Sequence, residues 1–266
     1  MTFSIKGKTA IVTGAADGIG LAIARHLADR GANVMAADMN EKKLIEELGS
    51  DAEDGDIRVF SGDLRQRLTI ANLISATIDA FDQIDILVNA SRQVLVTDAL
   101  DVEDTSVSTL LDQNLMTALS LSQLVAKRMI KQAEDQPEGQ IGAIINLSSI
   151  AARQSQPDLM GYAIAAAAVQ QMTRSMALVL AEHRIRVNAI AFGSVMSASL
   201  RTAVAENREW RNDIRSNTPL GRIAAPTELC EAVQFLAAES SSFMTGEVMT
   251  IDGGRSLLDA VTSPAH

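Results

Sequence analysis

Three glycines lie within the short segment 14–20, between two segments of different character. The apolar run 9–12 before them is long enough for a buried strand, and apolar residues recur at helical spacing over 21–27 after them. A second apolar run, 33–37, ends at Asp38. Strand, glycine turn, helix and strand, in this order, form half of a dinucleotide-binding unit. The stretch therefore predicts an α/β fold that binds a dinucleotide.

A glycine turn at the start of a helix suits a pyrophosphate, because the helix start offers unpaired N–H groups and the positive end of its dipole. Glycine also lets a ligand approach the backbone closely. Asp38 lies eighteen positions after Gly20, where a carboxylate can bind an adenosine ribose and repel a 2′-phosphate. Asp17 adds to that repulsion, so we expect NAD rather than NADP. The alternative is a glycine-rich turn without a ligand, which leaves the strand, helix and acid unexplained.

Composition narrows the classes of protein that the chain can belong to. Its 266 residues, 47% of them hydrophobic, suit one globular α/β domain over 1–266. A net charge of −10 argues against nucleic-acid binding, and the single cysteine, Cys230, forms no intramolecular disulfide and favours a reducing compartment. Neither a signal peptide nor an uninterrupted apolar stretch of ~18 residues is evident, so we expect a cytoplasmic protein without a membrane segment.

The rest of the chain alternates between strand and helix patterns. A parallel sheet with helices on both faces follows from this alternation. We predict a doubly wound parallel sheet of about seven strands in a single Rossmann-like domain. Beyond the first two strands, the expected strands are 57–60, 84–89, 141–149 and 185–191, followed by a last strand and turn over 247–254. The expected helices are 41–48, 68–81, 104–131, 161–181 and 228–238.

The glycine spacing Gly-x-x-x-Gly-x-Gly, which follows Thr13, resembles that of the short-chain dehydrogenase/reductase family. Further motifs follow in the family's order from about residue 6 to 254. For Asp63, the resemblance implies a hydrogen bond to the adenine, whereas the alternative is an acid that caps the helix near Leu68. The cofactor-binding residues that the resemblance implies are Gly14, Asp17, Gly18, Ile19, Gly20, Asp38, Asp63, Leu64, Asn89, Tyr162, Gly193 and Val195.

Two segments depart in part from the family pattern. The sequence Asn89-Ala90-Ser91-Arg92 stands where the family has Asn-Asn-Ala-Gly, so that only Asn89 matches and Arg92 replaces a glycine near the cofactor. Arg92 could also bind a phosphate or a substrate carboxylate, or lie on the surface. Where the family has Pro-Gly-x-Ile/Val-x-Thr, Gly193 and Val195 match, Phe192 replaces proline and Ser197 replaces threonine. The resemblance implies that the backbone of Val195 binds the nicotinamide carboxamide.

The catalytic residues that the resemblance implies are Asn114, Ser149 and Tyr162. Tyr162 lies thirteen positions after Ser149, which is the family's serine-to-tyrosine spacing. Ser149 would orient the substrate oxygen, and Tyr162 would exchange a proton with it. Asn114 resembles the asparagine that kinks a helix and holds a water in a proton relay; the alternative is a polar residue on a helix face. Segment 197–220 resembles the substrate lid, where Trp210 would line the pocket or pack in the core.

One position departs from this catalytic set. A tyrosine that acts as a base near neutral pH needs a nearby positive charge, because free tyrosine has a pKa of about 10. The family places a lysine four residues after the tyrosine, but here that position is Ala166. Another cation such as Arg92 or Arg153 could act together with the oxidised nicotinamide, the protein could bind NAD without catalysis, or the alanine could be an engineered replacement.

The remaining constellations favour no other chemistry. Three scattered histidines and one cysteine predict no metal site, and none of the histidines has a placement that suits a Ser-His-Asp hydrolase. We therefore expect an NAD(H)-dependent oxidoreductase of a small alcohol or ketone, with a non-catalytic NAD-binding regulatory or assembly protein as the alternative. The family's usual assembly predicts a homotetramer, or a dimer, joined through long helices that include the Ala-rich face over 163–181. The identity of the substrate stays open.

Overall fold

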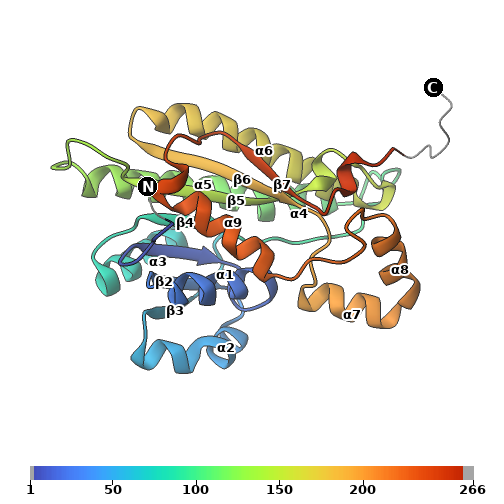
Figure 1. The fold of residues 1–266 in the computed structure, drawn as a ribbon, viewed down its shortest axis with the longest axis horizontal. Helices are drawn as coiled ribbons and strands as arrows, with labels where there is room; N and C mark the ends of the chain where they lie inside the picture. The colour runs from blue at the N-terminus through green and yellow to red at the C-terminus, as the bar shows by residue number, and fades with distance from the viewer. Residues whose placement is uncertain (1–2, 260–266) are drawn as a thin grey trace.

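The computed structural model describes residues 3–259, excluding the side chains at 50–54, 198, 199, 203 and 208. Seven parallel strands form one sheet in the order β3-β2-β1-β4-β5-β6-β7 (Figure 1). The prediction of a doubly wound parallel sheet of about seven strands in one domain is therefore confirmed. The strands are β1 (Thr9–Thr13), β2 (Asn33–Asp38), β3 (Ile57–Ser61), β4 (Ile86–Asn89), β5 (Gly142–Ser149), β6 (Ile185–Phe192) and β7 (Val248–Ile251).

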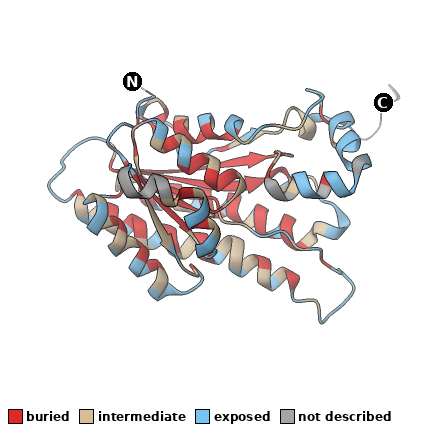
Figure 2. Ribbon diagram, turned by 90° about the horizontal axis from the view of Figure 1, so that it is seen from below, coloured by how far each residue is buried: buried red, intermediate tan, exposed pale blue. Residues whose placement is uncertain are grey.

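Helices cover both faces of the sheet because successive strand side chains point to opposite sides. In β1, Val12 packs on the face that carries α1 and α9, and Ile11 packs on the face that carries α3, α5 and α6. Figure 2 shows the buried residues along the sheet and on the helix sides that face it. The helices are α1 (Gly18–Asp29), α2 (Glu41–Asp54), α3 (Arg67–Phe81), α4 (Ser106–Leu110), α5 (Thr117–Gln132), α6 (Met160–Ala181), α7 (Ala198–Glu206), α8 (Arg208–Ser216) and α9 (Thr227–Ala237).

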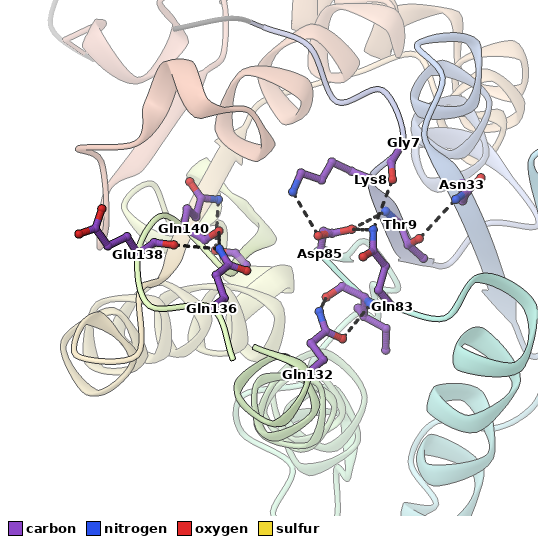
Figure 3. Close-up of polar contacts among 12 residues, drawn as sticks. Gly7, Lys8, Thr9, Asn33, Gln83, Asp85, Gln132, Gln136, Glu138 and Gln140 are labelled. Carbon is purple, nitrogen blue, oxygen red and sulfur yellow. Dashed lines mark hydrogen bonds and ion pairs between the residues drawn. The ribbon is translucent and has the colours of Figure 1, made fainter. Parts of the chain in front are cut away.

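The amino-terminal edge of the sheet is fixed by polar side chains (Figure 3). The carboxylate of Asp85, just before β4, accepts hydrogen bonds from the backbone N–H of Thr9 at 2.8 Å and from the side chain of Gln83 at 3.0 Å. Gln132, the last residue of α5, bonds both the N–H and the carbonyl of Ile84, at 3.1 and 2.7 Å. These bonds fix where β1 and β4 begin and leave the opposite edge to the loops that form the site.

At the carboxyl edge, the strand order reverses between β1 and β4, which is where open α/β sheets bind their ligands. The loops that follow these two strands are joined through Thr13, whose hydroxyl accepts hydrogen bonds from the N–H of Ala90 at 3.0 Å and of Ser91 at 3.1 Å. The glycine loop and the loop that carries Arg92 therefore lie side by side at the switch point.

One expected helix is interrupted. Instead of a single helix over 104–131, the chain forms α4, a π-helical segment η1 (Leu111–Met116) and then α5. The Thr117 hydroxyl donates to the carbonyl of Asp112, five residues earlier, at 3.0 Å. The wider turn brings Asn114 toward the loop after β4, which it binds as described below. Apolar periodicity extends through the interruption, so the pattern could not reveal it.

Among the described residues, one helical segment, Pro157–Ala181, is long and apolar enough to span a membrane, judged by length and composition alone. Half of its most apolar window is buried within the protein, and α6 packs against β5 and β6. Core helices of globular proteins meet the same criteria. The apolar character of α6 is therefore accounted for by packing on the sheet.

Candidate cofactor-binding and active site

A cleft of about 470 Å³ opens at the carboxyl edge of the sheet, between the loops that follow β1, β2, β3 and β4. It brings together eight of the residues predicted to bind the cofactor: Gly14, Asp17, Gly18, Ile19, Gly20, Asp38, Asp63 and Leu64. It is also lined by residues that were not predicted to bind the cofactor: Ala37, Met39, Gly62, Arg65, Ala90, Ser91, Arg92, Gln93, Gln113 and Ser197.

The glycine loop has no room for side chains. Gly14 has a φ of +67°, and a Cβ placed on it would lie 2.8 Å from the Cα of Ser91. A Cβ on Gly20 would lie 2.1 Å from the carbonyl oxygen of Gly14. Both distances are shorter than van der Waals contact, so only glycine allows the loop to pass this close to β4 and to the start of α1.

Two carboxylates lie beside the glycine loop. Asp17 caps α1, since its Oδ1 accepts the N–H of Gly18 at 2.6 Å, and its Oδ2 pairs with the ammonium group of Lys43. Asp38 ends β2 and accepts the N–H of Ala16 at 3.2 Å and of Asn40 at 2.9 Å. Each carboxylate oxygen can accept about two hydrogen bonds, so Asp38 keeps acceptor capacity for a ribose hydroxyl. The donor and acceptor set fits the adenosine half of a dinucleotide.

Asp63 is bound by an arginine that the sequence reasoning missed. Arg65 Nε lies 2.9 Å from Asp63 Oδ1, and Arg65 Nη2 lies 2.7 Å from Oδ2. These side-chain hydrogen bonds hold the pKa of the Asp63 carboxyl below its usual value of 3.8. The alternative role as a cap is wrong, because α3 begins at Arg67 with Gln66 as its cap residue, and Asp63 binds Arg65 instead. The opposite charges two positions apart were the available signal.

Asn89 lies beneath the cleft in a buried polar network. Its Nδ2 donates to Ser122 Oγ at 3.0 Å and to Asn146 Oδ1 at 2.8 Å, and Asn146 in turn donates to Thr173 Oγ1 at 2.9 Å. The network joins β4 and β5 to α5 and α6. It leads to a cavity of about 20 Å³, lined by Asn89, Ser91, Arg92, Asn114, Ala118, Asn146, Leu147, Ser148, Tyr162, Ala166 and Val169.

Tyr162 is the third residue of α6, and it is 7% exposed. Its phenol oxygen accepts a hydrogen bond from Arg92 Nη1 at 2.8 Å. The Arg92 guanidinium also lies over the ring of Phe192, with its Cζ 4.5 Å from the ring centroid. Ala166 faces the same small cavity as Tyr162 and Arg92. Arg92 therefore contacts both the Tyr162 phenol and the Phe192 ring, and Ala166 lines the small cavity beside Arg92 and Tyr162.

Ser149 ends β5 and is buried. Its hydroxyl accepts the N–H of Ala151 at 3.1 Å, and its carbonyl accepts a bond from Gln170 Nε2 at 3.2 Å. Gln170, two helical turns after Tyr162, is buried and was missed by the sequence reasoning. Its spacing on α6 was the available signal, because residues at i, i+4 and i+8 share one helix face.

Asn114 lies in η1, and its side chain fixes the loop that carries Arg92. Its Oδ1 accepts the N–H of Gln93 at 2.7 Å, and its Nδ2 donates to the carbonyl of Gln93 at 2.9 Å. The predicted helix irregularity at Asn114 coincides with the π-helical segment. The predicted proton-relay water stays a prediction.

The segment after β6 closes the cleft on the side of the glycine loop. A Cβ on Gly193 would lie 3.0 Å from the Cβ of Asp252, and Val195 forms a parallel bridge with Ala224. Ser197 lines the cleft, whereas Gly193 and Val195 are not among the residues that line it. The nicotinamide contact expected of Val195 stays a prediction.

Two sequence alternatives for single residues are wrong. Trp210, in α8, is 54% exposed, so it is not a core residue, and it is not among the residues that line the cleft. Arg153 is exposed, and the cation that contacts Tyr162 is Arg92. Within residues 3–259, no group of three or more His, Cys, Asp or Glu is placed to hold a metal ion.

Residues 14–256 match a family model described as enoyl-(acyl carrier protein) reductase. The 3-oxoacyl-(acyl-carrier-protein) reductase FabG of Thermotoga maritima is 33% identical over 254 residues, which cover 94% of this chain and 98% of the relative. The oxidoreductase UcpA of Salmonella typhimurium is 32% identical over 271 residues, covering 97% and 98%.

A solved structure of 7α-hydroxysteroid dehydrogenase, in complex with NADH and 7-oxo glycochenodeoxycholic acid, has a TM-score of 0.86 to this chain at 28% identity, and 95% of each chain is covered. The matches extend over almost the whole length of this chain and of the proteins that resemble it. The structural match agrees with the parallel sheet and flanking helices described above. The chain therefore belongs to the short-chain dehydrogenase/reductase family of oxidoreductases.

Proposed function

We propose that this protein is an NAD(H)-dependent oxidoreductase that interconverts a small alcohol and its ketone. The observation that carries the proposal is the buried Tyr162 phenol, in contact with the Arg92 guanidinium, which itself lines the glycine-and-acid cleft. A phenol beside a cation can give up and take back a proton, and the cleft supplies the surroundings for a dinucleotide. Both halves of the reaction then have a place in one site.

The adenosine end favours NAD. Asp38 would bind the ribose, the N–H groups at the start of α1 would face the pyrophosphate, and Ile19 and Leu64 would pack against the cofactor. The carboxylates of Asp17 and Asp38 would repel a 2′-phosphate, although Lys43 offsets part of the charge of Asp17. The related hydroxysteroid dehydrogenase structure contains NADH, which agrees with this choice. A bound nicotinamide ring would accept or donate the hydride.

The protein's own residues would manage the oxygen and its proton. Ser149 would hold the substrate oxygen by a hydrogen bond, and Tyr162 would donate the proton to a ketone or remove it from an alcohol. Because the phenol oxygen accepts the bond from Arg92, its own proton is free to point toward the substrate. Asn114 would act through the loop at Gln93, which it binds at both backbone groups. Asn89, Gly193 and Val195 complete the proposed cofactor contacts.

The proposal extends to the segment over the site and to assembly. Segment 197–220, which forms α7 and α8, would be the substrate lid, and its Ser197 already lines the cleft. A groove of about 510 Å³ runs between α5 and α6 on the outer face, lined in part by Leu124, Ile130 and Met176. The exposed apolar residues Leu178 and Val179 continue that face. We infer a cytoplasmic homotetramer, or a dimer, that buries these helices.

The test is the absorbance of NADH at 340 nm during incubation with a panel of ketones that includes steroid ketones and 3-oxoacyl thioesters. Turnover with at least one ketone is expected, and Tyr162→Phe serves as the inactive control. NADH binding without turnover on any member would favour a non-catalytic NAD-binding protein instead. Size-exclusion chromatography with light scattering tests the assembly, and a monomeric mass would overturn that part of the proposal.

A further inference from the structure

The loop after β4 supplies a cation to the tyrosine at the active site. We propose that Arg92 takes over the electrostatic role that the family assigns to a lysine on the tyrosine helix, and that a cation at 92 and one at 166 exclude each other. This inference rests on the proposed function, since it deepens the role of the same site. It explains why the chain carries alanine at a position that the catalytic chemistry would otherwise leave without charge.

The guanidinium is held in place from several sides. Its Nη1 donates to the Tyr162 oxygen at 2.8 Å, and its flat face lies 4.5 Å from the centroid of the Phe192 ring. A cation over an aromatic face is attracted by the electron density of the ring. On either side of Arg92 in the chain, Ser91 N–H is bound to Thr13 at 3.1 Å and Gln93 is bound to Asn114. Arg92 is therefore a fixed part of the site rather than a free surface arginine.

Phe192 and Arg92 form a cation–π contact that the family's usual residues at these two positions could not form. Proline at 192 would offer no aromatic face, and glycine at 92 would offer no charge. Phe192 ends β6 opposite Ser149 in the sheet register, so its ring is anchored by two strands. The two departures from the family pattern therefore form one contact, which a single engineered replacement at 166 would not produce.

The space beside Ala166 argues that a second cation does not fit. The cavity that Ala166 shares with Tyr162 and Arg92 measures about 20 Å³, which is room for roughly one water molecule. A lysine at 166 would place its ammonium group in this cavity, next to the guanidinium of Arg92. Like charges at such a distance repel strongly in a partly buried site. Charge at 166 is therefore compatible with the site only after Arg92 is removed.

Arginine also differs from lysine in what it contributes. A guanidinium keeps its charge at all pH values at which a protein is folded, whereas a lysine ammonium in a partly buried site loses its proton more readily. The planar group can contact the phenol and the Phe192 ring at the same time. Arg92 thus stabilises a phenolate at 162 over a wide pH range without needing a partner on α6.

The test uses the fact that Tyr162 is the sole tyrosine of the chain. Tyrosinate absorbs near ~295 nm, so a pH titration of ultraviolet absorbance reports this one residue, in the protein without cofactor. The variants are Arg92→Met, which removes the charge, Arg92→Lys, which keeps it, Arg92→Gly/Ala166→Lys, which moves it to α6, and Ala166→Lys alone. Arg153→Met is the matched control, because Arg153 is exposed. Circular dichroism and thermal melting verify that each variant is folded.

We expect phenolate to form at a higher pH in Arg92→Met than in the wild type, because the variant lacks the guanidinium that donates to the Tyr162 oxygen at 2.8 Å and favours the ionised form. Arg92→Lys and Arg92→Gly/Ala166→Lys should recover most of the shift, Ala166→Lys alone should lower the melting temperature, and Arg153→Met should match the wild type. Superimposable profiles for the wild type and Arg92→Met would overturn the inference. A shifted profile without turnover on any substrate would refute only the proposed function, and turnover that survives Arg92→Met unchanged would refute only the inference.

Discussion

The two ends of the cleft keep to the family pattern to different degrees. At the adenosine end, the glycine loop, Asp17 and Asp38 all match. The backbone constrains this end, since a Cβ on Gly14 would lie only 2.8 Å from the Cα of Ser91, and Asp38 is held by two N–H groups. At the Tyr162 end, positions 92, 166 and 192 all depart, yet Arg92 contacts both Tyr162 and Phe192, and Ala166 lines the same small cavity as Arg92. Backbone geometry tolerates few substitutes, whereas a charge at one point can be supplied by any element that reaches it.

Tyr162→Phe should have the largest effect and should distinguish the role of the Tyr162 end in catalysis from that of the adenosine end in NADH binding. Loss of a general acid and base typically lowers kcat by about 10²- to 10⁴-fold. NADH affinity should change little, because the adenosine end does not include the phenol. Initial rates and calorimetric titration of the same preparation measure both quantities. A variant that keeps wild-type kcat would show that the proton comes from another group.

Gly20→Ala should have the reverse effect. The new Cβ would lie 2.1 Å from the carbonyl oxygen of Gly14, so the loop must move away from its binding position. We expect NADH affinity to fall at least about tenfold, which corresponds to about 1.4 kcal/mol of binding free energy, together with a lower melting temperature. Gly139→Ala is the control, because its φ of +83° also disfavours alanine, but it lies in a surface loop away from the cleft. Equal NADH affinities for the two variants would contradict the assignment of the glycine loop.

Asp38→Ser tests the selectivity of the adenosine end. Removing the carboxylate removes both an acceptor for the ribose and a repulsive charge for a 2′-phosphate. The ratio of NADPH to NADH affinity should rise by about tenfold or more. Asp56→Ser, which removes an exposed charge at the far end of β3, is the matched control. An unchanged ratio would mean that another group selects the cofactor.

The smallest effect is expected from Asp63→Asn. The pKa of the Asp63 carboxyl is lower in the folded chain than in the unfolded chain, where it is 3.8. Its contribution to stability is therefore complete above pH 3.8 and is lost as the pH falls through the folded-state pKa. The pair with Arg65 is exposed, so the melting temperature should fall by at most about 4 °C at pH 7, and the difference from the wild type should shrink as the pH falls below 3.8. Because the Asp63 carboxyl stays ionised between pH 5 and 7, its protonation should not change the NADH affinity of the wild type in that range. A gap that widens in acid would contradict the ion pair.

The sequence was sufficient for the features that depend on neighbours along the chain. Apolar periodicity located the strands and most helices, and the glycine spacing located the loop that only glycine can form. It was insufficient where side chains from distant segments meet. Arg92 and Tyr162 lie seventy positions apart, and their contact depends on the path of a loop that Asn114 fixes from η1. Apolar periodicity did not reveal the π-helical segment, which only the family resemblance at Asn114 indicated, and the exposure of Trp210 depends on how α8 packs.

The central claim is that the cleft at the switch point binds an unphosphorylated nicotinamide dinucleotide. Isothermal titration calorimetry of the wild-type protein with NADH, and separately with NADPH, tests it most directly. We predict saturable heat with NADH and a dissociation constant for NADPH that is at least about tenfold higher. No heat with either dinucleotide, or tighter binding of NADPH, would contradict the account.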